Sequence, residues 1–196
     1  MLCGYLVEKE NLPLLRKLGV KDSKLLTADK RKKMFSELKK IAAGTKIIQV
    51  PAHEIDSSNN LNKLEIRKMQ EIINFLKPDR VYIDAPERNV KRFSEKIAKG
   101  LEKKTEIISE NYADRKYLQV GAASIIAKIA RDAEIVKLHK IYGNFGSGYT
   151  SDERTIAFLK DWIKENKEFP PEVRKSWITV GELIREKQQK KLSAFG

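Results

Sequence analysis

Arg80-Val-Tyr-Ile-Asp84 decides the fold, because it is a short apolar run between two prolines that ends in a carboxylate. Such a run predicts a buried strand. Residues 61–76, just before it, carry apolar side chains at helical spacing. After it, residues 90–101 predict a helix and residues 105–109 another strand. Strands and helices therefore alternate on both sides of Asp84, which is typical of an α/β domain.

The N-terminal quarter of the chain extends this alternation. Residues 2–7 form a short apolar run that predicts a strand beginning almost at the first residue. Thr27 is a candidate N-cap for a helix that runs to about Ile41. Residues 45–50 predict another strand, which Pro51 ends.

The C-terminal part is predicted to be helical. Residues 120–140 have the spacing of one long helix, and Thr150-Ser-Asp-Glu153 has the capping-box pattern that precedes a helix. The apolar spacing around Trp177 indicates a last helix, and the polar residues from Arg185 onwards are expected to fray.

The composition favours a polyanionic partner. The 196 residues suffice for one domain, and 40 Lys and Arg against 27 Asp and Glu give a net charge of +13. Nucleic acid is the first expectation, and a basic soluble protein with solvated lysines is the alternative. Cys3 is the single cysteine and no run is long enough to span a membrane, so a cytoplasmic location is expected.

Asp84 is a candidate metal ligand. A carboxylate at the C-terminal end of a strand is well placed to reach a crevice at the edge of the sheet. The alternative is that Asp84 organises the turn before Pro86. Local sequence does not decide between the two.

Asp132 is the second candidate. Helical geometry places it on the inward face of its helix, and Ser124, Lys128 and Asp132 form an i, i+4, i+8 line beside the apolar stripe. Lys128 and Asp132 could form an ordinary helical ion pair. Alternatively, the line faces a cleft in which Ser124 and Lys128 approach a phosphate and Asp132 a divalent cation.

Several motifs, in this order, resemble those of ribonuclease HII of the archaeal type. The similarity covers nearly the whole chain, from Leu2 to about Glu186, and the spacing of the motifs is like that of the family. The motifs are Val20-Lys-Asp-Ser-Lys-Leu25, Val81-Tyr-Ile-Asp84, Ala122-Ala-Ser-Ile-Ile-Ala-Lys128, Arg131-Asp132, Gly146-Ser-Gly-Tyr149 and Phe169-Pro-Pro-Glu-Val-Arg-Lys175 with Trp177.

The resemblance implies an α/β fold in which a ribonuclease H-like mixed sheet is flanked by helices and followed by a C-terminal helical extension. It places the catalytic domain in residues 1–145, a helical substrate-binding region in residues 146–186 and a flexible tail in residues 187–196. It also implies four carboxylates around the site, of which Asp84 and Asp132 match the third and fourth.

The family's other two carboxylates lie in an Asp-Glu-Ala-Gly-Arg-Gly segment on a central first strand, and this sequence contains no such segment. Glu8 and Glu10 lack the adjacent glycines and are not substitutes. Without that strand we expect the sheet to split, exposing two strand edges that promote pairing with another chain. We expect DNA upstream of the Met1 codon to encode the segment in frame, and we expect the chain as given to bind substrate but cleave it poorly.

The resemblance also assigns a substrate and ligands. The reaction is hydrolysis of RNA in RNA–DNA hybrids, or at ribonucleotides in duplex DNA, with Mg²⁺ or Mn²⁺. Tyr149 would pack against the ribonucleotide sugar, although from the motif alone packing against the following helix is an equal alternative. The predicted phosphate contacts are Ser23, Lys24, Ser124, Lys128, Arg174 and Lys175.

Two further features complete the predictions. Gln189, Leu192 and Phe195 resemble a peptide that docks on the sliding clamp, although Gly196 stands where the second aromatic is usual and a plain disordered tail is the alternative. His53 and His139 match no motif and are predicted to be surface residues. The alternatives to an enzyme are a noncatalytic hybrid-binding module and an unrelated basic RNA-associated protein.

Overall fold

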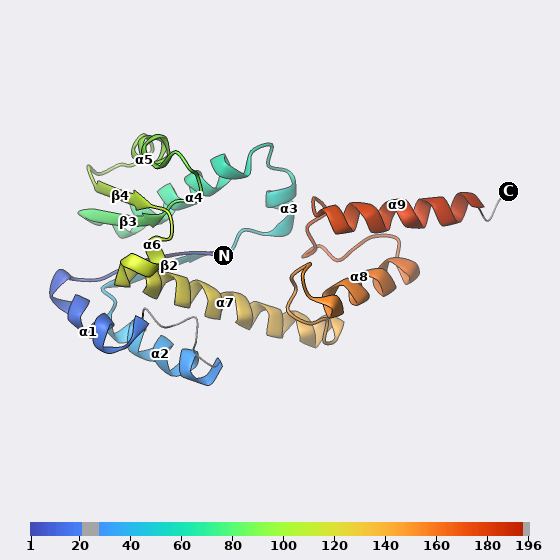
Figure 1. The fold of residues 1–196 in the computed structure, drawn as a ribbon, viewed down its shortest axis with the longest axis horizontal. Coiled ribbons are helices and arrows are strands. Elements are labelled where there is room, and N and C mark those ends of the chain that lie inside the picture. The colour runs from blue at the N-terminus through green and yellow to red at the C-terminus, as the bar shows by residue number, and fades with distance from the viewer. Residues whose placement is uncertain (21–27, 194–196) are drawn as a thin grey trace. The chain divides into compact units, whose positions relative to one another are not determined.

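The computed structural model describes residues 1–20 and 28–193 (Figure 1). The chain forms two compact units. Unit 1 comprises Met1–Gln49 and Asn62–Arg131, and unit 2 comprises Val50–Leu61 and Asp132–Gly196. These units follow packing, whereas the predicted division after residue 145 followed function and stays a prediction.

Unit 1 contains two separate two-stranded sheets. β1 (Leu2–Leu6) pairs antiparallel with β2 (Gly44–Ile48), from Leu2 opposite Ile48 to Leu6 opposite Gly44. β3 (Arg80–Asp84) pairs parallel with β4 (Glu106–Glu110). Within the described residues no strand joins β1 to β3. The expected split of the sheet is therefore confirmed.

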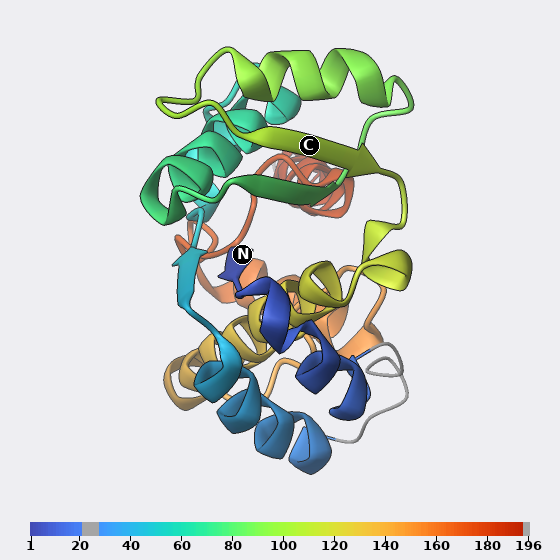
Figure 2. The same cartoon turned by 90° about the vertical axis from the view of Figure 1, so that its left-hand side faces the viewer.

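Helices pack against both sheets of unit 1. β3 packs through Ile83 against a core that includes Phe93 and Ile97, and Figure 2 shows the helices beside this sheet. β1 packs through Cys3 and Tyr5 against a second core. The elements are η1 (Lys9–Asn11), α1 (Leu12–Lys17), α2 (Ala28–Ile41), α4 (Leu61–Leu76), α5 (Val90–Ala98), α6 (Ala113–Lys116) and the start of α7 (Leu118–Tyr142).

Gly4 is required where β1 crosses α4. A Cβ atom at this position would lie 2.2 Å from Cγ2 of Ile72 and 2.7 Å from Cδ1 of Leu76. Only a residue without a side chain permits so close an approach. The even-numbered face of β1 at Gly4 is thus directed at α4, and the odd-numbered residues are directed at the core that α7 shares.

Unit 2 is built from α3 (Ala52–Asp56), the end of α7, α8 (Glu153–Glu165) and α9 (Ile178–Ser193). Leu159, Phe169 and Val180 are among its buried core residues. Among the helices of residues 1–20 and 28–193, none is long and apolar enough to cross a membrane.

The predicted elements are confirmed with small shifts at their ends, and two details differ. Asp152, and not Thr150, caps α8, because its side chain accepts a hydrogen bond from the Arg154 N–H. Residues 187–193, predicted as part of a flexible tail, are helical, and Lys187 Nζ donates to the carbonyl oxygens of Ile163 (2.5 Å) and Asn166 (2.7 Å). The predicted cap Thr27 lies outside the described residues.

Candidate nucleic-acid interface and carboxylate positions

A glycine-rich turn in unit 2 presents Tyr149. Gly146 and Gly148 have φ angles of 82° and 72°, a conformation that glycine adopts without strain. A Cβ on Gly146 would lie 2.6 Å from Oδ2 of Asp152. Both glycines are therefore dictated by the shape of the turn, which explains the Gly-Ser-Gly pattern.

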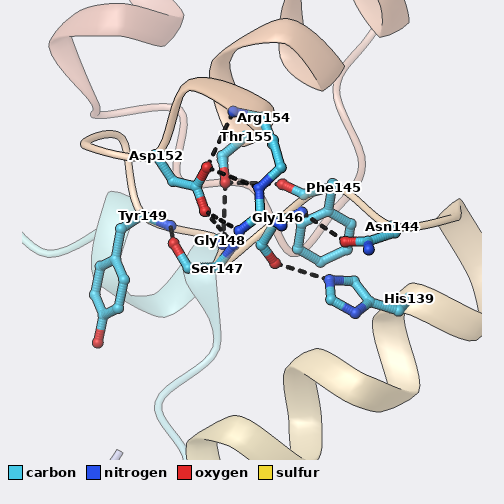
Figure 3. Close-up of polar contacts among 10 residues, drawn as sticks. All are labelled: His139, Asn144, Phe145, Gly146, Ser147, Gly148, Tyr149, Asp152, Arg154 and Thr155. Atoms are coloured by element: carbon cyan, nitrogen blue, oxygen red, sulfur yellow. Dashed lines mark hydrogen bonds and ion pairs between the residues drawn. The ribbon is translucent and has the colours of Figure 1, made fainter.

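Asp152 holds the turn against the start of α8 (Figure 3). Its Oδ2 accepts from the Ser147 N–H at 2.7 Å, and its Oδ1 accepts from the Arg154 N–H at 3.0 Å. The Arg154 guanidinium also contacts this carboxylate, with Nη2 3.2 Å from Oδ2. Hydrogen bonds from the Arg154 side chain and then from the Ser147 backbone hold the pKa of Asp152 far below its ordinary value. Asp152 is therefore ionised and fixed.

Thr155 and His139 complete this network. The Thr155 hydroxyl is buried, donates to the Phe145 carbonyl oxygen at 2.9 Å and accepts from the Gly148 N–H at 3.0 Å. His139 Nε2 donates to the Gly146 carbonyl oxygen at 2.8 Å, and its ring packs edge-on against Phe145. His139 was predicted as a surface residue, but it is half-buried and holds the turn.

Tyr149 stands at the exposed end of the rigid turn. Its side chain is 53% exposed, and its ring points away from the network of polar contacts (Figure 3). Its backbone is fixed on both sides, since its N–H donates to Ser147 Oγ at 3.4 Å and its carbonyl accepts from the Asp152 N–H at 3.0 Å. The turn thus fixes the backbone that carries this exposed aromatic side chain.

A second carboxylate fixes the predicted phosphate contacts of unit 2. Asp56 Oδ2 accepts from the Lys175 N–H at 2.6 Å, and Oδ1 accepts from the Ser176 N–H at 3.1 Å. Although desolvation opposes it, these hydrogen bonds and the charge of Arg174 hold the pKa of Asp56 below its ordinary value. Lys175 is exposed, and the Arg174 guanidinium lies 5.9 Å from the centre of the Trp177 ring. Asp56 therefore orders the segment that carries both cations.

Asp84 ends β3 with an exposed carboxylate. Its Oδ1 accepts from the Ala113 N–H at 3.1 Å, so it anchors the start of α6 and not merely its own turn. Glu65 on α4 lies nearby. Burial and then the negative charges of Asp84 and Glu87 raise the pKa of Glu65. Glu65 was missed because helical periodicity does not reveal that it faces a strand end.

The predicted line on α7 is confirmed as a feature of one continuous helix. Ser124 and Lys128 are exposed, and Asp132 is half-buried. Asp84 belongs to unit 1 and Asp132 to unit 2, so their convergence stays a prediction. Of the remaining candidates, Gln189 is exposed on α9 and Leu192 belongs to it. Ser23, Lys24 and Phe195 lie outside the described residues.

Among the residues that the structure describes, the donor set does not fit a two-metal centre. Among residues 1–20 and 28–193, no three His, Cys, Asp or Glu side chains are grouped closely enough to hold a metal ion. A Mg²⁺ ion takes about six oxygen ligands, and two ions about 4 Å apart need several converging carboxylates. Asp84 and Asp132 alone supply too few.

Known proteins resemble the chain over most of its length. The profile of the family described as Ribonuclease HII matches residues 1–180. Ribonuclease HII of Pyrococcus furiosus is 44% identical over 194 residues, which are 97% of this chain and 87% of that protein.

Two solved structures extend the similarity to the fold. The crystal structure of ribonuclease H2 from Pyrococcus horikoshii has a TM-score of 0.88 at 42% identity, and the match covers 92% of this chain and 87% of that one. Ribonuclease HII in the PCNA:RNase HII complex from Archaeoglobus fulgidus has a TM-score of 0.81 at 35% identity, covering 93% and 96%. These matches confirm the predicted ribonuclease H-like fold.

Proposed function

Because the chain belongs to the ribonuclease HII family, we propose that it recognises RNA–DNA hybrids and ribonucleotides in duplex DNA as a ribonuclease H endonuclease. The observation that carries the proposal is the preorganised turn that presents Tyr149, in a chain 44% identical to a ribonuclease HII. The net charge of +13 supports binding of a phosphate backbone, with release of counterions.

Substrate recognition is proposed to divide between the turn and the cations. Tyr149 contacts the sugar of the ribonucleotide, whose 2′-OH distinguishes RNA from DNA. Lys175 and Arg174, ordered by Asp56, contact phosphates, as do Ser124 and Lys128 on α7. Phosphate contacts position the duplex and Tyr149 supplies the discrimination.

Cleavage is proposed to depend on Mg²⁺ or Mn²⁺, which would supply an activated water and stabilise the leaving oxygen. Asp84 and Asp132 are the proposed ligands from this chain. Because these donors are too few, we expect the 196-residue chain to bind substrate and to cleave it poorly or not at all. The same observation favours a second candidate function, a noncatalytic hybrid-binding module.

A sliding clamp is the proposed protein partner. A relative of 35% identity was solved as a PCNA:RNase HII complex. Gln189, Leu192 and Phe195 are the proposed docking residues, and Gln189 is exposed at the surface of α9. Truncation before Gln189 is expected to abolish clamp binding and to leave duplex binding unchanged.

The decisive experiment measures binding and cleavage separately. Fluorescence anisotropy compares a DNA duplex that contains one ribonucleotide with the all-DNA duplex, for the unaltered chain, Tyr149→Ala and the control Ile141→Ala. Ile141 is 67% exposed, so its truncation tests general loss of surface. Tyr149→Ala is expected to weaken binding of the ribonucleotide duplex about tenfold, equivalent to ~1.4 kcal/mol, and the control to leave it unchanged.

Cleavage of the same labelled duplex is followed with Mg²⁺ or Mn²⁺. Weak metal-dependent cleavage that both Asp84→Asn and Asp132→Asn abolish supports the enzyme, whereas binding with no detectable cleavage, unchanged by either substitution, supports the binding module. Equal affinity for the two duplexes, unaffected by Tyr149→Ala, would contradict both proposals and leave only a nonspecific nucleic-acid binder.

A further inference from the structure

Tyr112, which lies between β4 and α6, combines an unfavourable backbone conformation with an exposed ring. Its φ of 58° and ψ of 34° are left-handed, a conformation that is strained for a bulky residue other than glycine. Its side chain is 67% exposed, so burial does little to offset the strain. Glycine or asparagine would adopt the same conformation more easily. The stability of this turn therefore does not explain why a tyrosine stands here.

The residues on both sides of Tyr112 hold it in this conformation. The Asn111 side chain donates through Nδ2 to the Ala85 carbonyl oxygen at 2.6 Å, in the connection that follows β3. The N–H of the buried residue Ala113 donates to Oδ1 of Asp84 at 3.1 Å. Strained residues persist where the surrounding structure fixes them in this way, and they are frequent at ligand-binding sites. The Tyr112 ring is thus carried by a fixed backbone at the end of β3.

Arg115 supplies a cation beside the exposed ring. Its guanidinium carbon Cζ lies 5.0 Å from the centre of the Tyr112 ring, within the range of a cation–π contact. Arg115 is itself exposed, and its backbone N–H donates to the Tyr112 carbonyl oxygen at 3.0 Å. Because the guanidinium lies over one face of a ring that is 67% exposed, the other face is open to solvent. An open aromatic face beside a guanidinium suits an unpaired base and its phosphate.

The charge and the location of this pair favour nucleic acid as its partner. The chain has a net charge of +13, and Arg88, in the connection between β3 and α5, is exposed. β3 and β4 are parallel, and their carboxyl ends meet where Asp84 lies opposite Glu110, the edge at which ligands bind in open α/β sheets. The charge of Glu110 is paired with Lys116. A nucleic acid bound at Asp84 therefore lies within reach of the Tyr112 ring.

We propose, on the basis of the nucleic-acid function proposed above, that the Tyr112 ring stacks on the base of an unpaired nucleotide and that Arg115 contacts its phosphate. Bases inside a duplex are stacked on both sides, so a free base face comes from single-stranded nucleotides. The preferred substrate is then a ribonucleotide-containing duplex that continues into a single strand. Tyr112 adds affinity for that strand, whereas Tyr149 discriminates the ribonucleotide.

The test measures how much a single-stranded overhang adds to the affinity of the full chain. Fluorescence anisotropy without divalent metal compares a blunt DNA duplex that contains one ribonucleotide with the same duplex carrying an oligothymidine overhang. Stacking of a base on an aromatic ring contributes about 5- to 150-fold in affinity, and we expect a gain of about tenfold from the overhang. Tyr112→Ala is expected to remove this gain, and Tyr112→Phe, which keeps the aromatic face, to retain it.

Tyr112→Gly separates a contact of the ring from a purely structural role. Glycine adopts the left-handed conformation without strain, so this variant is expected to have a higher urea midpoint than Tyr112→Ala, followed by circular dichroism. If Tyr112 only shaped the turn, glycine would restore the gain from the overhang. We expect Tyr112→Gly instead to bind the overhang as weakly as Tyr112→Ala, because both lack the ring.

Phe75 and Lys46 provide a matched control pair. Phe75, near the end of α4, is 61% exposed, and Lys46 Nζ lies 4.6 Å from the centre of its ring. This pair has the same chemistry, but Phe75 has an ordinary helical backbone. Phe75→Ala is expected to leave the gain from the overhang unchanged. Arg115→Gln is expected to reduce the slope of log affinity against log salt by about 0.7 for the overhang, and Lys46→Gln to leave that slope unchanged.

Photochemical cross-linking locates the contact directly. A 5-iodouracil placed in the overhang is expected to cross-link to Tyr112, as mapped by mass spectrometry of the digested chain, and the cross-link is expected to be lost in Tyr112→Ala. The proposal is overturned if the overhang adds no affinity, if its gain persists in Tyr112→Ala, if Tyr112→Gly restores it, or if the cross-link maps to another residue.

The same measurements keep this proposal distinct from the proposed function. A ribonucleotide preference that depends on Tyr149, together with an overhang gain that ignores Tyr112, overturns the stacking site and retains the ribonuclease H-type recognition. An overhang gain that depends on Tyr112, without any ribonucleotide preference, supports the stacking site and contradicts the ribonucleotide recognition.

Discussion

Replacing Gly146 with alanine tests whether the turn that carries Tyr149 depends on the close contact between Asp152 and the backbone at Gly146. A methyl group at this position would push the Asp152 carboxylate away. Gly143 provides a matched control, because its φ of 78° is close to the 82° of Gly146. A Cβ on Gly143 meets no atom within 4 Å, whereas a Cβ on Gly146 lies 2.6 Å from Asp152 Oδ2 and 3.0 Å from Arg154 Cβ. Both variants therefore place an alanine in the same left-handed backbone conformation, but only Gly146→Ala also brings a methyl group into contact with Asp152 and Arg154.

The magnitudes follow from these two contributions. A left-handed conformation costs an alanine about 1–2 kcal/mol, so Gly143→Ala is expected to lower the free energy of unfolding by that amount. In Gly146→Ala the Asp152 carboxylate must also move away from the Ser147 N–H, which it now holds at 2.7 Å. Loss of a partner for a half-buried donor adds about 1–3 kcal/mol. The expected difference between the variants is that second contribution.

The assay is urea unfolding followed by tryptophan fluorescence. The chain has two tryptophans, Trp162 and Trp177, and both lie in unit 2 with the turn, so the signal reports the affected unit. Anisotropy with the ribonucleotide duplex is expected to show weaker binding for Gly146→Ala than for Gly143→Ala. Equal losses of stability and affinity in the two variants would refute the reasoning, because strain alone would then explain the turn.

Two other substitutions test the same network. Thr155→Val removes the hydroxyl of a residue that is 3% exposed, so the Phe145 carbonyl and the Gly148 N–H lose their hydrogen-bond partner. We expect the free energy of unfolding in urea to fall by about 1–3 kcal/mol. The exposed control Thr150→Val is expected to leave it unchanged. Asp152 has a pKa below its ordinary 3.8, so its stabilisation is present above about pH 4 and is lost as the pH falls through the folded value. Asp152→Asn is therefore expected to flatten the acid dependence of the urea midpoint, and an unchanged acid dependence would contradict this role.

Local signals in the sequence predicted the elements well. Residues 80–84 form β3 with the predicted bounds, because a short run with β-branched and aromatic residues between prolines favours a strand. Residues 61–76 likewise form α4 as predicted. Ser124, Lys128 and Asp132 lie along one helix because their spacing alone determines it.

Contacts between distant residues could not be predicted in this way. Thr150 satisfies the capping-box pattern, but Asp152 is the cap because it also accepts from Ser147, and only the folded turn brings those groups together. His139 has no motif, and its role follows from the position of the Gly146 carbonyl. The periodicity of apolar residues predicts one helix or strand at a time. It does not reveal which backbone carbonyl or N–H of a distant segment will lie beside a given side chain.

The contact of Asp56 with Lys175 has a consequence for synthesis on the ribosome. The two residues are 119 positions apart, and unit 2 combines Val50–Leu61 with the C-terminal third of the chain. At about 5–20 residues per second, translation separates the emergence of the two partners by on the order of ten seconds. During that interval unit 1 can fold, whereas Val50–Leu61 has not yet met the C-terminal residues of unit 2 that it contacts. This segment is then accessible to chaperones and proteases.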